Sequence, residues 1–135
     1  MESALKDYKK IILDTKNSSK EQRIQAAFHL ENIADDESVK ALAKALFTDP
    51  SPIVRHECAF ALGETAHPKE AGKYLMKAIE TDKSVFVRHE SLLALATLGD
   101  SSFESFITRF LKDKDPDIAE SSEIALQRLK ETGSY

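Results

Sequence analysis

Residues 49–82, DPSPIVRHECAFALGETAHPKEAGKYLMKAIETD, decide the fold. Two segments, IVRHECAFALGE and KEAGKYLMKAI, carry apolar residues at helical spacing. The turn at 66–68 separates them, and Ser51 can cap the first segment with Pro52 at the first helical position. The stretch therefore predicts a hairpin of two helices.

The same pattern recurs along the chain at a period of about 32 residues. AFHL at 27–30 aligns with AFAL at 59–62 and with LLAL at 92–95, and the pair at 125–126 continues the series. Each two-helix unit can bury its apolar side only against its neighbours. The repeat therefore predicts an all-α fold, an α-solenoid of about eight helices in stacked hairpins.

The length of 135 residues suits one domain, so we expect a single repeat domain over residues 1–135. Both ends of a solenoid need a helix that covers the last apolar side. We expect an N-terminal capping helix within 1–16 and a C-terminal capping helix at 116–131.

Composition narrows the possible partners and the compartment. The formal net charge of −4 argues against nucleic acid, because phosphate binding needs a dense basic surface. Cys58 is the single cysteine, which excludes an intrachain disulfide and fits a reducing compartment. No apolar run approaches the roughly 18 residues of a membrane span. The N-terminus carries charges throughout and no signal-peptide pattern, so we expect a cytoplasmic protein with no membrane partner.

A His-Glu pair occurs twice in register, within VRHE at 54–57 and again within VRHE at 87–90. At 100° per residue, Val54 and Cys58 fall on the buried side of the first helix. His56 points nearly opposite to them. It is therefore not a core histidine by pattern, and the second helix repeats this geometry.

The residues His56, Glu57, His89 and Glu90 offer two imidazoles and two carboxylates. Packed helices have axes about 8–10 Å apart, so equivalent side chains on adjacent helices can converge on one ion. A set of two histidines and one carboxylate suits non-haem iron(II), and zinc or manganese would also accept it. The competing interpretation is that both pairs are solvated helix residues.

The repeat units on either side of the two His-Glu pairs lack such pairs. At the positions of the His-Glu pair, the first unit has Ile24 and Gln25, and the last unit has Glu120 and Ser121. Ligand-type pairs therefore occur only in the two central units.

Three arginines also recur in register, at Arg23, Arg55 and Arg88. Arginines at fixed repeat positions commonly pair with acids in the turns. We expect a structural role for them, with Asp49 and Asp82 as partners.

The repeat DPSPIVRHECAFALGETAHPKEA resembles the HEAT-like repeat first described in phycobilin lyases. Over residues 23–129 the chain also resembles one half of deoxyhypusine hydroxylase. The similar segments are RIQAAFHL, VRHECAFALGE, VRHESLLALATLGD and DPDIAESSEIALQRL. That family is a HEAT-repeat diiron monooxygenase, which hydroxylates a spermidine-modified lysine on a translation factor. The resemblance implies an α-solenoid of HEAT-like helical hairpins.

The resemblance also implies roles for the His-Glu pairs. In the family, each half supplies two such motifs, and the halves face each other across two irons. Carried over to this chain, His56, His89 and Glu90 would ligate one iron. Glu57 would be a carboxylate beside the site, catalytic in proton transfer or binding a cationic amine substrate.

This chain has two motifs where the family has four. A diiron centre would then need a homodimer with one iron per chain, because two-fold symmetry places the same patch of each subunit face to face. Phe60 and Leu93 lie on the same side as the histidines and would be apolar contacts there.

Three functions follow from these patterns. The first is a deoxyhypusine hydroxylase-like diiron monooxygenase that uses O₂ on a lysine- or polyamine-modified protein. The second is a non-catalytic HEAT-repeat scaffold for protein–protein interaction. The third is a metal-binding or phycobilin-lyase-like accessory protein without oxygenase chemistry.

Overall fold

The computed structural model describes residues 2–132, and within this range the chain forms helices and connecting turns with no strand. In chain order the elements are α1 (Glu2–Leu13), α2 (Lys20–Ile33), α3 (Asp36–Thr48), α4 (Pro52–Glu64), α5 (Pro68–Thr81), α6 (Val85–Thr97), the 3₁₀-helix η1 (Ser101–Phe103), α7 (Glu104–Thr108) and α8 (Pro116–Thr132). The predicted all-α solenoid of about eight helices is confirmed.

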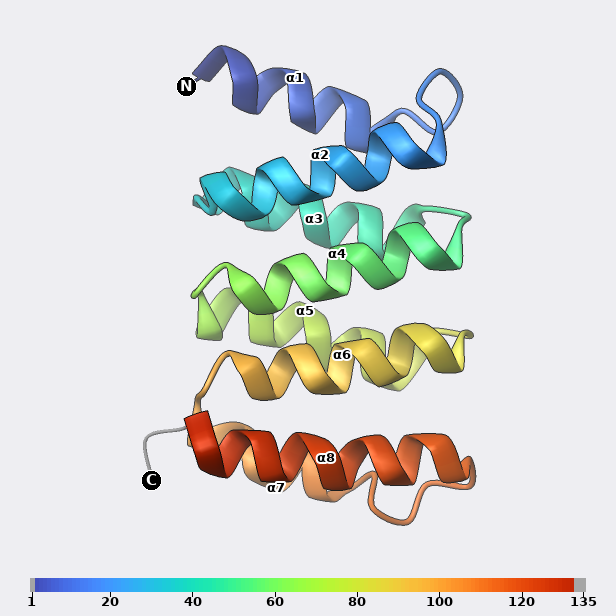
Figure 1. Cartoon of the computed structure of the whole chain (residues 1–135), viewed down its shortest axis with the longest axis vertical. Helices are drawn as coiled ribbons and strands as arrows, with labels where there is room; N and C mark the ends of the chain where they lie inside the picture. The colour runs from blue at the N-terminus through green and yellow to red at the C-terminus, as the bar shows by residue number, and fades with distance from the viewer. Residues whose placement is uncertain (1, 133–135) are drawn as a thin grey trace.

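The helices form two layers along the long axis of the molecule (Figure 1). The first layer contains α2, α4, α6 and α8, and each of these packs against the next. The second layer, α3, α5 and α7, lies behind it. We call the exposed side of the first layer the front face, because the His-Glu pairs lie there.

Serine caps fix the start of each first-layer helix before α8. Ser51 accepts a hydrogen bond from the amide of Val54, as predicted, and Pro52 stands at the first helical position. Ser84 does the same for α6, and Ser19 forms a capping box with Gln22 at the start of α2. Each cap satisfies an amide that the helix leaves without a partner.

Each repeat contains an arginine–aspartate ion pair between a first-layer helix and the turn that ends the following second-layer helix. These three pairs, which we call the arginine–aspartate ladder, are Arg23 Nε–Asp49 Oδ2 at 2.8 Å, Arg55 Nε–Asp82 Oδ2 at 3.0 Å and Arg88 Nη2–Asp113 Oδ2 at 3.1 Å. The predicted partners Asp49 and Asp82 are thereby confirmed. The third partner is Asp113.

The aspartates of the ladder also reach the start of the next helix. Asp49 Oδ1 accepts the amide of Ser51 at 2.9 Å, and Asp82 Oδ1 accepts the amide of Ser84 at 2.9 Å. One carboxylate thus binds the preceding first-layer helix and the cap of the following one. This double contact fixes the register between neighbouring repeats.

The buried side of the first layer follows the predicted helical spacing. Val54, Cys58 and Leu62 have no measurable exposure. Gly63 lies where α4 meets α6, and a Cβ atom there would stand 2.8 Å from the Cβ of Ala94 and 2.9 Å from its Cα. The two helices therefore approach each other as closely as their backbones allow.

The terminal helices occupy the segments in which we expect caps. Within 1–16 the structure has α1, which packs on α2 and α3 and buries Ile12; Met1 lies outside the described residues. At the other end α8 packs on α6 and α7. The capping role of both helices stays a prediction. In the described part of the chain, no helix has the length and apolar character needed to cross a membrane.

Replacing Arg23 with alanine tests the arginine–aspartate ladder. The Arg23 and Asp49 side chains are only 5% and 1% exposed. The substitution would leave the Asp49 carboxylate buried without its counter-charge, so we expect the free energy of unfolding to fall by about 3–5 kcal/mol. Denaturant unfolding followed by circular dichroism measures this change in the free energy of unfolding.

Arg109→Ala is the matched control, because Arg109 pairs with Glu80 on the surface. Its loss should lower the free energy of unfolding by about 1 kcal/mol or less. Equal effects of the two substitutions would contradict a structural role for the ladder.

Candidate metal site

His56 lies between two carboxylates on the front face. Its Nε2 is 3.2 Å from Glu90 Oε1 on α6, and its Nδ1 is 3.3 Å from Glu57 Oε1 on its own helix. The ring stacks on Phe86 of α6, with centroids 4.0 Å apart and an interplanar angle of 6°. Phe86 therefore fixes the plane of the His56 ring, and the two carboxylates engage its two nitrogens.

These neighbours favour the protonated ring. The hydrogen bond to Glu90 is the largest cause that raises the pKa of His56, and attraction to Glu90 and Glu57 adds to it, while burial opposes them. An imidazolium donates from both nitrogens and so satisfies both carboxylates. When the ring is protonated, His56 and Glu90 form an ion pair between adjacent repeats.

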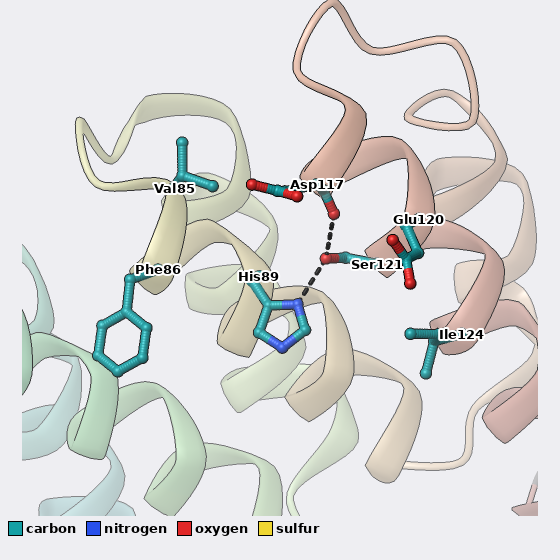
Figure 2. A pocket seen from close by; sticks show the side chains of 7 residues that line it. All are labelled: Val85, Phe86, His89, Asp117, Glu120, Ser121 and Ile124. Atoms are coloured by element: carbon teal, nitrogen blue, oxygen red, sulfur yellow. Dashed lines mark hydrogen bonds between the residues drawn. The ribbon is translucent and has the colours of Figure 1, made fainter.

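His89 is held by α8 rather than by its own helix (Figure 2). Its Nδ1 forms a short hydrogen bond with Ser121 Oγ, and that hydroxyl donates to the carbonyl oxygen of Asp117 at 2.6 Å. A pocket of about 390 Å³ opens beside the ring, between α6 and α8. Its lining combines apolar side chains with a histidine, a hydroxyl and two carboxylates: Val85, Phe86, His89, Asp117, Glu120, Ser121 and Ile124.

Both histidines are contacted from the next first-layer helix, but through different ring nitrogens, Nε2 of His56 and Nδ1 of His89. Glu90 and Ser121 occupy equivalent positions of α6 and α8, and each contacts the histidine of the preceding first-layer helix. The next repeat therefore supports both His56 and His89. The residue at this position is one source of the chemical difference between the two sites, and the stacking of Phe86 on His56 is another.

The predicted site residues are thus only partly brought together. His56, Glu57 and Glu90 share contacts, whereas the hydrogen bond of His89 goes to Ser121. Among residues 2–132 as described, no three His, Cys, Asp or Glu side chains are grouped so that they could hold a metal ion.

The His56–Glu90 pair nevertheless has a spacing that fits a metal. An ion lies about 2.0–2.2 Å from a histidine nitrogen or a carboxylate oxygen. Two such ligands at neighbouring positions of a tetrahedral or octahedral site are then roughly 3.0–3.5 Å apart. The 3.2 Å separation of His56 Nε2 from Glu90 Oε1 lies in this range. The distance between these two atoms would therefore suit a shared metal ion as well as a proton.

Apolar side chains lie exposed beside the histidines. Phe28 of α2, Phe60 of α4 and Ile124 of α8 are exposed, and Leu93 of α6 is half-buried. These four residues occupy equivalent positions in their repeats, four residues after the His position, and we call them the apolar stripe. The stripe runs along the front face next to the candidate site.

The front face is also acidic near Glu57. Burial raises the pKa of Glu31 on α2, and repulsion from Glu64 and Glu57 raises it further. Such a surface favours cations, because a bound positive charge would relieve this repulsion.

Four residues of the site were missed from the sequence. Phe86 was not recognised as a stacking partner, and Asp117, Glu120 and Ser121 were assigned no role at the site. The signal that could have found them is the repeat itself. Phe86 and Asp117 are three residues before the His position of their helices, so each lies on the front face.

The fold and the sequence identify the class of protein. Residues 10–88 match the family of HEAT repeats. This segment is more than half of the chain, so the protein belongs to the HEAT-repeat family.

Within this class the chain is similar to deoxyhypusine hydroxylases, as its sequence indicated. It is 35% identical to that of Aspergillus oryzae over 131 residues, which cover 91% of this chain and 38% of the relative. It is 32% identical to that of Drosophila pseudoobscura over 119 residues, which cover 88% of this chain and 39% of the relative.

Solved structures show the same fold. Human deoxyhypusine hydroxylase in complex with glycerol superposes with a TM-score of 0.89 at 24% identity, over 99% of this chain and 47% of the human chain. An engineered protein superposes with a TM-score of 0.59 at 24% identity, over 96% of this chain and 63% of its own. The chain thus spans about two fifths of the length of the curated relatives that it matches, and about half of the human chain.

The His56–Glu90 pair predicts a pH dependence of stability in metal-free protein. The folded state raises the pKa of His56 above its ordinary value. The resulting stabilisation is complete below the unfolded pKa of about 6.5 and is lost as pH rises through the folded value. We expect the free energy of unfolding, measured in the presence of a chelator, to fall over this interval.

In Glu90→Gln the larger part of that pH dependence should disappear, because the main cause of the raised pKa is removed. Glu123→Gln, an exposed carboxylate of α8, is the control and should keep the wild-type profile. Parallel profiles for wild type and Glu90→Gln would show that the ion pair does not form.

Proposed function

We propose that this chain is a metal-binding HEAT-repeat protein that acts as a non-haem diiron monooxygenase of the deoxyhypusine hydroxylase type, with the diiron site assembled across a homodimer. The observation that carries the proposal is the His56–Glu90 contact at metal-ligand spacing between adjacent repeats. The similarity to deoxyhypusine hydroxylases over most of the chain supports it.

In this proposal His56, His89 and Glu90 hold one iron per chain. When bound, iron supplies the reduction of O₂ that a hydroxylation requires. The chain supplies the ligands and their orientation. His56 is held by Phe86, and His89 is held by Ser121.

Glu57 has the proposed role of catalytic carboxylate. Its Oε1 contacts His56 Nδ1, and its side chain is 36% exposed, so it can accept a proton or bind an amine while remaining accessible. Asp117 and Glu120 add carboxylates at the pocket beside His89. These acids suit a lysine- or polyamine-modified protein as substrate, because a cationic side chain needs partners of opposite sign.

The proposed homodimer follows from the number of motifs and from the front face. A two-fold axis would place the apolar stripe of one protomer opposite that of its partner, next to both metal sites. Burial of Phe28 and Phe60 would supply apolar area for association. The free, buried Cys58 leads us to propose the cytoplasm as the compartment. We propose neither nucleic acid nor membrane as a partner.

The second candidate is a non-catalytic scaffold for protein–protein interaction. It is favoured by the contacts of His56, whose two nitrogens already face carboxylates, since this arrangement is complete as an ion pair. In that case the apolar stripe would bind a partner protein and no metal would be needed.

Metal content separates the two candidates. We expect protein reconstituted anaerobically with iron(II) to hold about one iron per chain, and His56→Ala and His89→Ala each to lose it, because each removes a proposed ligand. Both variants should keep their helical circular dichroism, since neither histidine belongs to the core. His29→Ala is the control, because this exposed histidine of α2 stacks on Tyr8 of α1 and is not a proposed ligand. Unchanged iron in the two site variants would remove the assignment.

Association through the front face is tested with Phe60→Asp. A carboxylate in the centre of the apolar stripe should shift the protein from dimer to monomer in sedimentation experiments at micromolar concentration. Phe47→Asp, on the second layer, should leave the dimer intact. A monomeric wild-type protein under these conditions would contradict the proposed assembly.

A further inference from the structure

We infer that Ser121 is a positioning residue that holds His89 in the tautomer whose Nε2 is free to bind a metal. This role rests on the proposed metal site and extends it to α8, a helix that carries no His-Glu pair. The inference comes from the position of a single hydroxyl proton.

The Ser121 hydroxyl has one proton and two contacts. Its oxygen is 2.6 Å from the carbonyl oxygen of Asp117, and it also contacts Nδ1 of His89. Two oxygens at that separation repel each other unless a proton lies between them, so the hydroxyl donates to Asp117. The oxygen can then only accept from His89, and Nδ1 must carry the proton.

The other ring nitrogen is left with its lone pair. In neutral imidazole one nitrogen is a donor and the other an acceptor, so a proton on Nδ1 leaves Nε2 as the acceptor. Figure 2 shows this nitrogen turned away from Ser121. Among the described residues, no hydrogen bond engages Nε2 of His89, and the His89 side chain lines the pocket between α6 and α8. It is therefore the nitrogen available to an ion.

Burial makes this assignment firm. Ser121 is 2% exposed, so water does not compete for its oxygen. The hydroxyl is itself fixed by its bond to the carbonyl one helical turn earlier, which holds its lone pairs toward His89. The ring orientation thus follows from the backbone of α8.

The equivalent residue in α6 contacts its histidine differently. Glu90 at that position lies 3.2 Å from His56 Nε2, the nitrogen that a metal must reach, whereas Ser121 contacts Nδ1 of His89. A serine oxygen accepts a hydrogen bond from Nδ1–H without adding negative charge. The solenoid thus supplies two kinds of partner. Glu90 is charged and can itself be a metal ligand, whereas Ser121 is neutral and only orients the ring of His89.

Nitrogen-15 NMR of the histidine rings in metal-free protein at pH 8 tests the inference directly. Wild-type His89 should show a protonated Nδ1 and an unprotonated Nε2. In Ser121→Ala the Nδ1–H signature should be lost. The iron(II) affinity of this variant should fall by about 10- to 100-fold, the usual effect of removing a partner that orients a metal-binding histidine. Ser121→Thr retains the hydroxyl and should restore both the tautomer and the affinity.

Ser122→Ala is the matched control, because Ser122 is also buried on α8 and its hydroxyl donates to the carbonyl of Ile107 instead. It should change neither the tautomer nor the affinity. A wild-type His89 protonated on Nε2, or a Ser121→Ala variant with unchanged tautomer, overturns the inference. Because the tautomer is read without metal, failure of the wild-type protein to bind iron would instead reject the proposed function.

Discussion

The arginine–aspartate ladder is the constraint on which the rest of the molecule depends. Asp49 binds Arg23 of the preceding first-layer helix and the amide of Ser51 at the start of the next one, and Asp82 repeats this arrangement. Because these charges are largely buried, a shift of one helix along another would break a pair that water could not replace. The ladder therefore sets the offset of each first-layer helix along its neighbour. This offset decides which side chains of neighbouring repeats face each other.

Once the register is fixed, equivalent positions of neighbouring helices meet. In α6 and α8 the residue after the His position contacts the histidine of the preceding first-layer helix. Glu90 there contacts Nε2 of His56 and raises the pKa of that ring, and Ser121 there forms a hydrogen bond with Nδ1 of His89. Two histidines that are equivalent in sequence are thereby contacted through different ring nitrogens. A solenoid can thus diversify a row of sites without altering its backbone, because each change affects only one inter-repeat contact.

Much of this organisation could be predicted from the sequence. Capping serines and the repeat period predicted the helices, and helical spacing placed His56 away from the core. The arginine partners Asp49 and Asp82 were also predicted. What could not be predicted was which front-face residues touch, because helical periodicity gives the direction of a side chain around its own axis and not the offset between two helices. The stacking of Phe86 on His56 and the bond from His89 to α8 both depend on that offset.

Gly63 has a mechanical consequence for the site. It lets the backbones of α4 and α6 touch near Ala94, so these helices cannot separate or slide without opening a void, and cannot come closer. Between α6 and α8 lies a pocket of about 390 Å³ instead. The front face is therefore closed between α4 and α6 and hollowed between α6 and α8. A ligand can enter the space beside His89 without separating α4 from α6.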